Sequence, residues 1–166
     1  MKPAEFWIEQ LGLIPHPEGG FFKETYRAED TVAKAGLPDR FPADRSASTG
    51  IYFLLRSQDF SHLHRIESDE MWHFYAGTSL TVHMLDEAGN YSTHKIGADP
   101  ENGAVFQAVV PAGVWFGATV DDPNSYALVG CTVAPGFDFA GFEMAERDKL
   151  MAQFPEHAEI IKRITK

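Results

Sequence analysis

The amino-acid sequence predicts a mainly β protein whose strands close into a jelly roll or a related small barrel. Many short runs rich in β-branched and aromatic residues recur about every 8–12 positions, and turn residues separate them. Helical patterns occur only near the two ends of the chain. Because these helices do not alternate with the strands, a parallel sheet built from strand–helix–strand units is disfavoured.

The size of the chain fits one domain over residues 1–166. We expect an N-terminal helix within 1–12, a β-barrel core over 21–135 and C-terminal helices within 143–166. The single cysteine, Cys131, offers no partner for a disulfide and is expected to be a buried, inert thiol.

The composition excludes several classes of partner. The formal net charge is −10 and no run of lysines or arginines occurs, so nucleic acid is not expected as the main partner. No apolar run approaches the roughly 20 residues that span a bilayer, so no membrane partner is expected. Glu5 and Glu9 interrupt the N-terminal apolar residues, unlike a signal peptide, and we expect a cytoplasmic protein.

The N-terminal part predicts a helix, a turn and a strand. Residues 3–11 have a helical pattern, and the proline- and glycine-rich stretch 14–20 must turn. His16 and Glu18 lie in that turn. They are expected to be ordinary turn residues, although Glu18 is also a candidate for the mouth of a pocket. A strand is expected over 21–27.

The next segment, residues 28–48, is polar and contains two prolines. It predicts a long exposed loop, either merely mobile or acting as a lid over a binding site. The remaining strands are expected at 49–55, 80–85, 91–97, 105–120 with a break at Pro111–Gly113, and 126–135. From residue 143 the pattern becomes helical, and Pro155 marks a break between two helices.

The candidate site is the stretch FSHLHRIESDEMWHFYAG, residues 60–77. Side chains alternate between the two faces of a strand, so His62 and His64 are predicted to share one face. By the same rule Glu70, Trp72 and Phe74 share a face. Two histidines, a carboxylate and two aromatic rings predict the floor of a small-molecule pocket.

The same stretch resembles the first motif of the cupin superfamily. His62 and His64 match its histidine pair, and Glu70 and Gly77 match its glutamate and closing glycine. One extra residue separates His64 from Glu70, and Arg56 stands where the motif opens on glycine. In the second motif Pro111-Ala112-Gly113 fits, whereas Phe116 replaces the histidine and Val120 replaces the asparagine.

Five stretches together resemble the fifth cupin family, a family of unknown function, over nearly the whole chain. They are HPEGGFFKETYR (16–27), IYFLL (51–55), HRIESDEMWHFYAG (64–77), VVPAGVWFGA (109–118) and VGCTVAPGFDFAGFE (129–143). The resemblance implies a double-stranded β-helix, similar in fold to sugar-nucleotide epimerases and cupin-type sugar isomerases. It also implies a homodimer, which the apolar strand 51–55 would favour if it needs cover.

The resemblance raises the question of a metal. A cupin metal centre uses the histidine pair, the glutamate and the second-motif histidine, which is Phe116 here. No cofactor is therefore predicted. If a divalent transition metal binds, the ligands would be His62, His64 and Glu70, an open three-ligand site.

Without a metal, the resemblance to epimerases implies acid–base catalysis. His64 would be the base, oriented by Glu70, and Tyr52 the acid, because its strand should lie beside the site. Gln107 would hydrogen-bond a ligand hydroxyl. Trp72, Phe74 and Trp115 would either stack on a sugar or belong to the core.

Three functions follow. The first is a protein that binds a small polar metabolite, such as a carbohydrate or nucleotide sugar, with isomerase or epimerase activity. The second is a non-catalytic small-molecule binding protein, favoured by the lost second-motif histidine. The third is a metal-dependent oxygenase, which would require bound metal.

Overall fold

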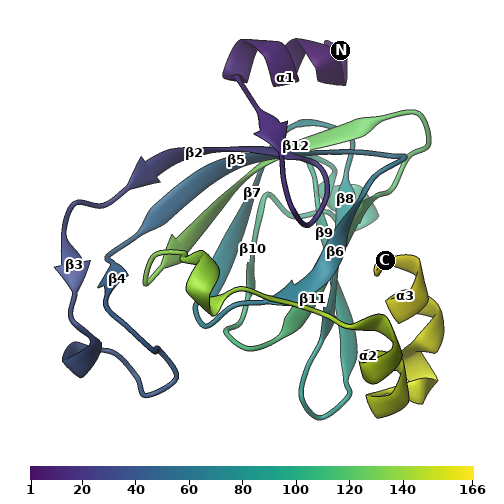
Figure 1. Ribbon diagram of the computed structural model, residues 1–166. Helices are drawn as coiled ribbons and strands as arrows, with labels where there is room; N and C mark the ends of the chain where they lie inside the picture. Colours follow the sequence, from purple (N-terminus) through teal and green to yellow (C-terminus); the bar gives the residue numbers. More distant parts are fainter.

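The computed structural model describes residues 1–166, and two antiparallel sheets facing each other dominate it (Figure 1). One sheet has six strands in the order β1-β2-β5-β12-β7-β10, and the other has five in the order β13-β6-β11-β8-β9. Strands far apart in sequence thus lie side by side, as in a jelly roll. The predicted fold class is confirmed.

The strands follow the predicted pattern closely. They are β1 (Ile14–Pro15), β2 (Phe21–Arg27), β3 (Thr31–Val32), β4 (Arg45–Ser46), β5 (Thr49–Arg56), β6 (Phe60–Arg65), β7 (Asp69–Gly77), β8 (Leu80–Leu85), β9 (Tyr91–Ile96), β10 (Gln107–Val110), β11 (Trp115–Val120), β12 (Tyr126–Ala134) and β13 (Glu143–Met144). The α-helices are α1 (Ala4–Leu11), α2 (Arg147–Gln153) and α3 (Ala158–Arg163), and the 3-10 turns are η1 (Lys34–Gly36), η2 (Pro100–Asn102), η3 (Phe139–Gly141) and η4 (Pro155–His157).

The main core lies between the two sheets. Phe53, Trp72, Val129 and Phe116 are each at most 1% exposed there, and all belong to one apolar cluster. On β7 the alternation holds as predicted, because Trp72 and the partly buried Phe74 both pack on this inner cluster. Burial of apolar surface between the sheets is the main force that holds the barrel together.

The helices cover the outer faces of the sheets. Helices α2 and α3, separated at Pro155 as predicted, pack Leu150 and Ile161 against the five-stranded sheet. Helix α1 lies over the six-stranded sheet, where Ala4 and Leu13 pack near Leu54 (Figure 1). None of the three α-helices has the length and apolar character that a membrane span requires.

Residues 28–48 are more ordered than a polar loop. Strands β3 and β4 pair with each other, and Figure 1 shows them extending to one side of the barrel. Phe41 is fully buried, and its ring lies beneath the guanidinium groups of Arg40 and Arg45. Arg45 also pairs with Glu67 at 2.9 Å. The expectation of a simple exposed loop is wrong, because a buried aromatic ring and an ion pair anchor the segment.

Candidate functional site

A β-bulge in strand β6 determines which side chains enter the barrel. Opposite β11, Ser61 pairs with Ala118 and His64 pairs with Phe116, so two residues of β6 face one residue, Gly117. A Cβ on Gly117 would lie 2.5 Å from the Ser61 carbonyl oxygen, so only glycine permits this approach.

The bulge overturns the predicted alternation. Ser61 and His64 both hydrogen-bond Glu18 at the inner face, whereas Leu63 packs outside, against α3. His62 does not line the inner cavity. Burial lowers the pKa of His62, and the positive charges of Lys166 and Arg147 in the C-terminal segment lower it further. His62 and His64 therefore do not form a ligand pair.

The turn at residues 16–20 carries Glu18 into the barrel. Gly19 has φ +106°, and a Cβ there would lie 2.2 Å from the Phe60 carbonyl oxygen. Glycine alone tolerates both conditions. The turn therefore packs directly on β6, where the His62 amide donates to the Glu18 carbonyl at 2.7 Å.

Glu18 and His64 form a buried ion pair, with His64 Nε2 2.9 Å from Glu18 Oε2. His64 Nδ1 lies 2.7 Å from the His62 carbonyl oxygen, which can only accept, so Nδ1 carries a proton. Burial disfavours the charged form of both side chains, but the attraction between them outweighs it. The charge and hydrogen bond of Glu18 therefore raise the pKa of His64, and those of His64 lower the pKa of Glu18. Ser61 Oγ donates to the other Glu18 oxygen at 3.1 Å.

Glu70 is a second carboxyl group with the opposite behaviour. It is 8% exposed, and burial raises its pKa to about 7, with His64 opposing this and Glu18 adding to it. The Cys131 thiol is its hydrogen-bond donor. Burial and the two carboxylates raise the pKa of Cys131, so the thiol stays protonated as expected of a buried cysteine.

His16 also belongs to the site. Its Nδ1 accepts the Glu18 amide at 3.1 Å, which places the ring proton on Nε2. Burial lowers the pKa of His16, and its ring packs edge-on against Phe22 at 4.4 Å. The sequence predicted His16 to be an ordinary turn residue. Its position two residues before Glu18 was the only local indication that it belongs to the site.

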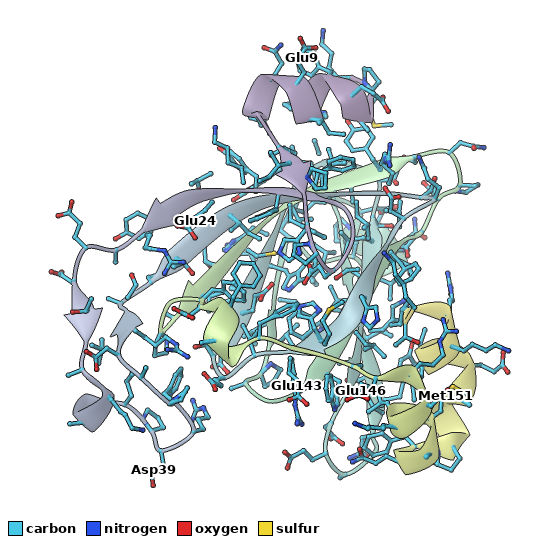
Figure 2. The ribbon with its side chains drawn as sticks, in the orientation of Figure 1. Glu9, Glu24, Asp39, Glu143, Glu146 and Met151 are labelled. Atoms are coloured by element: carbon cyan, nitrogen blue, oxygen red, sulfur yellow. The ribbon has the colours of Figure 1, made fainter.

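These groups line a small cavity of about 40 Å³ that opens past the exposed Glu24. The segment between β12 and β13 crosses from one sheet to the other in front of the barrel (Figure 1), and its Phe137 and Phe142 contribute to the walls. Figure 2 shows side chains filling the space between the sheets, with Glu24 labelled on β2. The lining residues are His16, Glu18, Glu24, Thr49, Ile51, His64, Glu70, Cys131, Val133, Phe137 and Phe142.

Three predicted site residues lie away from the cavity, and the structure does not bring them to it. Tyr52 packs at the outer face of β5, edge-on to Tyr75, because its neighbours on either side point inward. Gln107 is exposed and hydrogen-bonds His73. Trp115 packs under α2 and α3, with the Arg65 guanidinium over its ring.

Two further aromatic residues point inward but do not line the cavity. Trp72 is 1% exposed in the core, where its indole nitrogen has no hydrogen-bond partner, and Phe74 packs on the same cluster. Both belong to the core, the alternative that the sequence left open. Glu18, His64 and Glu70 are the predicted site residues that the structure brings together.

The residues do not fit a cupin-type metal centre. No group of three or more histidine, cysteine, aspartate or glutamate side chains is arranged to hold a metal ion. His62 lies outside the cavity, both ring nitrogens of His64 are hydrogen-bonded, and the Phe116 ring, 4.1 Å from His64 between centroids, occupies the second-motif position. The predicted set of His62, His64 and Glu70 is not assembled.

A larger hollow of about 770 Å³ lies elsewhere and contains none of these groups. Charged side chains such as Arg40, Arg65, Glu67 and Asp69 line it, together with the backbone near Pro111. It has no buried acid–base group, so the smaller cavity is the better candidate site.

Comparison with known proteins identifies relatives of the whole chain. The model of the family Cupin_5, described as cupin superfamily (DUF985), matches residues 5–145. The Uncharacterized protein YML079W of Saccharomyces cerevisiae is 32% identical over 151 residues, which cover 80% of this chain and 70% of that protein.

Two solved structures share both sequence and fold. Protein SO0799 from Shewanella oneidensis is 38% identical, with a TM-score of 0.89 over 100% of this chain and 99% of its own. A hypothetical protein from Leishmania major is also 38% identical, with a TM-score of 0.90 over 99% of both chains. Oxalate decarboxylase from Bacillus subtilis is 15% identical with a TM-score of 0.54, and 90% of this chain matches 36% of it, which shows the shared fold alone.

Proposed function

The chain belongs to the Cupin_5 family of the cupin superfamily (DUF985), and we propose that it is an acid–base enzyme acting on a small polar metabolite in the barrel. The proposed reaction class is isomerisation or epimerisation. The observation that carries this proposal is the buried, unpaired carboxyl of Glu70 in the cavity, beside the Glu18–His64 ion pair.

The geometry favours Glu70 rather than His64 as the group that exchanges the proton. Both His64 nitrogens carry protons and are hydrogen-bonded, so His64 has no lone pair to accept another. Glu70 has only the weak thiol donor of Cys131 and a pKa of about 7, close to the operating range of a general base. Two carboxyl groups whose surroundings push their pKa values apart are typical of acid–base sites.

In this mechanism ionised Glu70 removes a proton from a carbon next to a carbonyl group of the substrate. The C–H electron pair forms a carbon–carbon double bond and the carbonyl electron pair moves onto its oxygen. In an epimerisation Glu70 returns the proton to the opposite face of the same carbon. In an isomerisation the proton of the neighbouring hydroxyl passes to the former carbonyl oxygen, the hydroxyl oxygen becomes the new carbonyl, and Glu70 returns its proton to the former carbonyl carbon. The Glu18–His64 ion pair keeps the charge of the other buried carboxylate neutralised, so Glu70 is the group that exchanges the proton. No atom is gained or lost, as an isomerisation requires.

The test is solvent exchange in D₂O. The protein would be incubated with small aldoses, ketoses and their amino derivatives, and deuterium bound to carbon would be detected by NMR. We expect incorporation into at least one compound, and a loss of about 100-fold or more in Glu70→Gln, as is usual for removal of a general base. Glu101→Gln, which removes an exposed glutamate, is the matched control.

The alternative is a non-catalytic binding protein. Phe137 and Phe142 support it, because these apolar side chains in the cavity wall can contact a ligand without taking part in proton transfer. Binding of a carbonyl compound without deuterium incorporation would establish this alternative and contradict the enzyme proposal.

A further inference from the structure

We propose that the cavity takes a small organic cation, such as the ammonium group of an amine, and discriminates against anions. This inference rests on the site of the proposed function but concerns binding alone. The cation is the part of the ligand that enters the barrel, and its binding does not require turnover.

The charges around the cavity support a cation. Three glutamates line it, Glu18, Glu24 and Glu70, and no lysine or arginine does. The exposed Glu24 is already paired through both oxygens with Arg27 at 2.9 Å. The positive charge of His64 is already paired with Glu18 at 2.9 Å. Burial lowers the pKa of the other lining histidine, His16, which favours its neutral form. A bound carboxylate or phosphate would therefore meet the unpaired Glu70 carboxylate with no free cation beside it, at a high electrostatic cost inside a protein.

The Glu70 carboxyl is the group without a strong partner. It is 92% buried, being 8% exposed, and faces the cavity with the Cys131 thiol as its only donor. Buried carboxylates are normally paired or accept strong hydrogen bonds. An ammonium group provides both a positive charge and N–H donors, so it would satisfy the carboxylate that Cys131 leaves incompletely bonded.

Aromatic rings complete the surroundings. Phe137 and Phe142 line the cavity, 6.0 Å apart between centroids, and Phe142 lies 5.1 Å from the His64 ring. The faces of aromatic rings attract organic cations within about 6 Å. Carboxylates and aromatic rings together are the usual lining of sites for such cations.

The size of the cavity limits the head group. A water molecule needs roughly 10–15 Å³ of cavity, so about 40 Å³ holds about three non-hydrogen atoms. Ethylammonium has that size. The rest of a longer amine would extend past Phe137 and Phe142, where Phe139 is 53% exposed.

The experiment compares three compounds of similar size and different charge: ethylammonium, ethanol and acetate. Their dissociation constants would be measured by ligand-observed NMR at about 150 mM salt, which screens the net charge of the protein. We expect ethylammonium to bind at least about tenfold more tightly than acetate, and Glu70→Gln to remove that preference. Glu101→Gln, which loses the same charge outside the cavity, should retain it.

Tighter binding of acetate than of ethylammonium would overturn the proposal, as would equal binding of the two by the wild-type protein. Because this comparison uses the unmodified chain, it does not depend on the folding of a variant. A cation preference without deuterium exchange would support this inference while contradicting the enzyme proposal. Deuterium exchange combined with a preference for acetate would support the enzyme proposal and contradict this inference.

Discussion

At the scale of single residues, the two buried carboxyl groups of the site differ in pKa because they have different hydrogen-bond partners. Glu18 has the His64 ring at 2.9 Å and Ser61 Oγ at 3.1 Å, and its pKa is lowered. Glu70 is buried with only a thiol donor, and its pKa is raised to about 7. The same residue type thus provides one fixed charge and one exchangeable proton.

Glu70 should make the stability of the protein depend on pH. Its pKa is 4.5 when unperturbed and about 7 in the folded chain, so between these values the folded state binds more protons than the unfolded state. The free energy of unfolding therefore falls as the pH rises through this window, by about 3 kcal/mol from this group. Above about pH 7 its contribution stays constant.

Urea denaturation of the wild type and Glu70→Gln at about pH 5 and about pH 8 measures this effect. We expect Glu70→Gln to gain stability relative to the wild type as the pH rises, because glutamine never becomes charged. A constant difference between the two proteins across this range would show that Glu70 has an ordinary pKa.

At the scale of elements, two backbone features assemble the site: the bulge at His62 and Leu63, and the turn at residues 16–20. The alternation predicted from sequence holds on β7 from Glu70 to Phe74, before a register shift at Tyr75. It fails on β6, because one extra residue shifts every later side chain to the other face. Gly117 marks the bulge, but from sequence alone a strand glycine does not say which residue opposite it is extra.

Tyr52 illustrates a different limit of sequence reasoning. Its strand does lie in the sheet that contains β7, as predicted, but Tyr52 lies on the outer face. A strand that is apolar on both faces does not reveal from its sequence which face is inner. Long-range packing decides that, and also brings His16 and Glu18 beside β6.

The turn predicts a specific effect of Gly19→Ala. The new Cβ would have a positive φ and would lie 2.2 Å from the Phe60 carbonyl oxygen, so the turn must move away from β6. We expect a loss of about 3 kcal/mol in the free energy of unfolding and weakened contact between Glu18 and His64. Gly103→Ala is the control, since Gly103 also has a positive φ, +78°, but nothing within 4 Å, and should cost about 1 kcal/mol.

Thermal or urea unfolding of both variants provides the measurement. Equal losses for Gly19→Ala and Gly103→Ala would mean that the close approach of the turn to β6 does not constrain the site.

At the scale of the whole molecule, the sequence predicted the two-sheet barrel and its flanking helices because turn residues and hydrophobic patterns are local signals. The homodimer stays a prediction, as do the single domain and the cytoplasmic location. Strand 51–55 does not need a partner chain to cover Leu54, since α1 and its neighbours bury that side chain fully. Exposed apolar side chains remain elsewhere, such as Tyr75 at 52% and Phe106 at 58%.

We expect a dimer in solution, because exposed aromatic residues are typical of protein interfaces. Light scattering at micromolar concentration measures the mass. A mass of 18.5 kDa, that of one chain, would contradict the prediction.

The most direct test of the central claim is an NMR titration of glutamate side chains labelled with ¹³C at the carboxyl carbon. Comparison with Glu70→Gln assigns the Glu70 signal, and its chemical shift is followed from about pH 4 to pH 9. We predict a midpoint at about 7 for Glu70. A midpoint near the unperturbed value of 4.5 would show a permanently ionised carboxylate and contradict the proposed acid–base role.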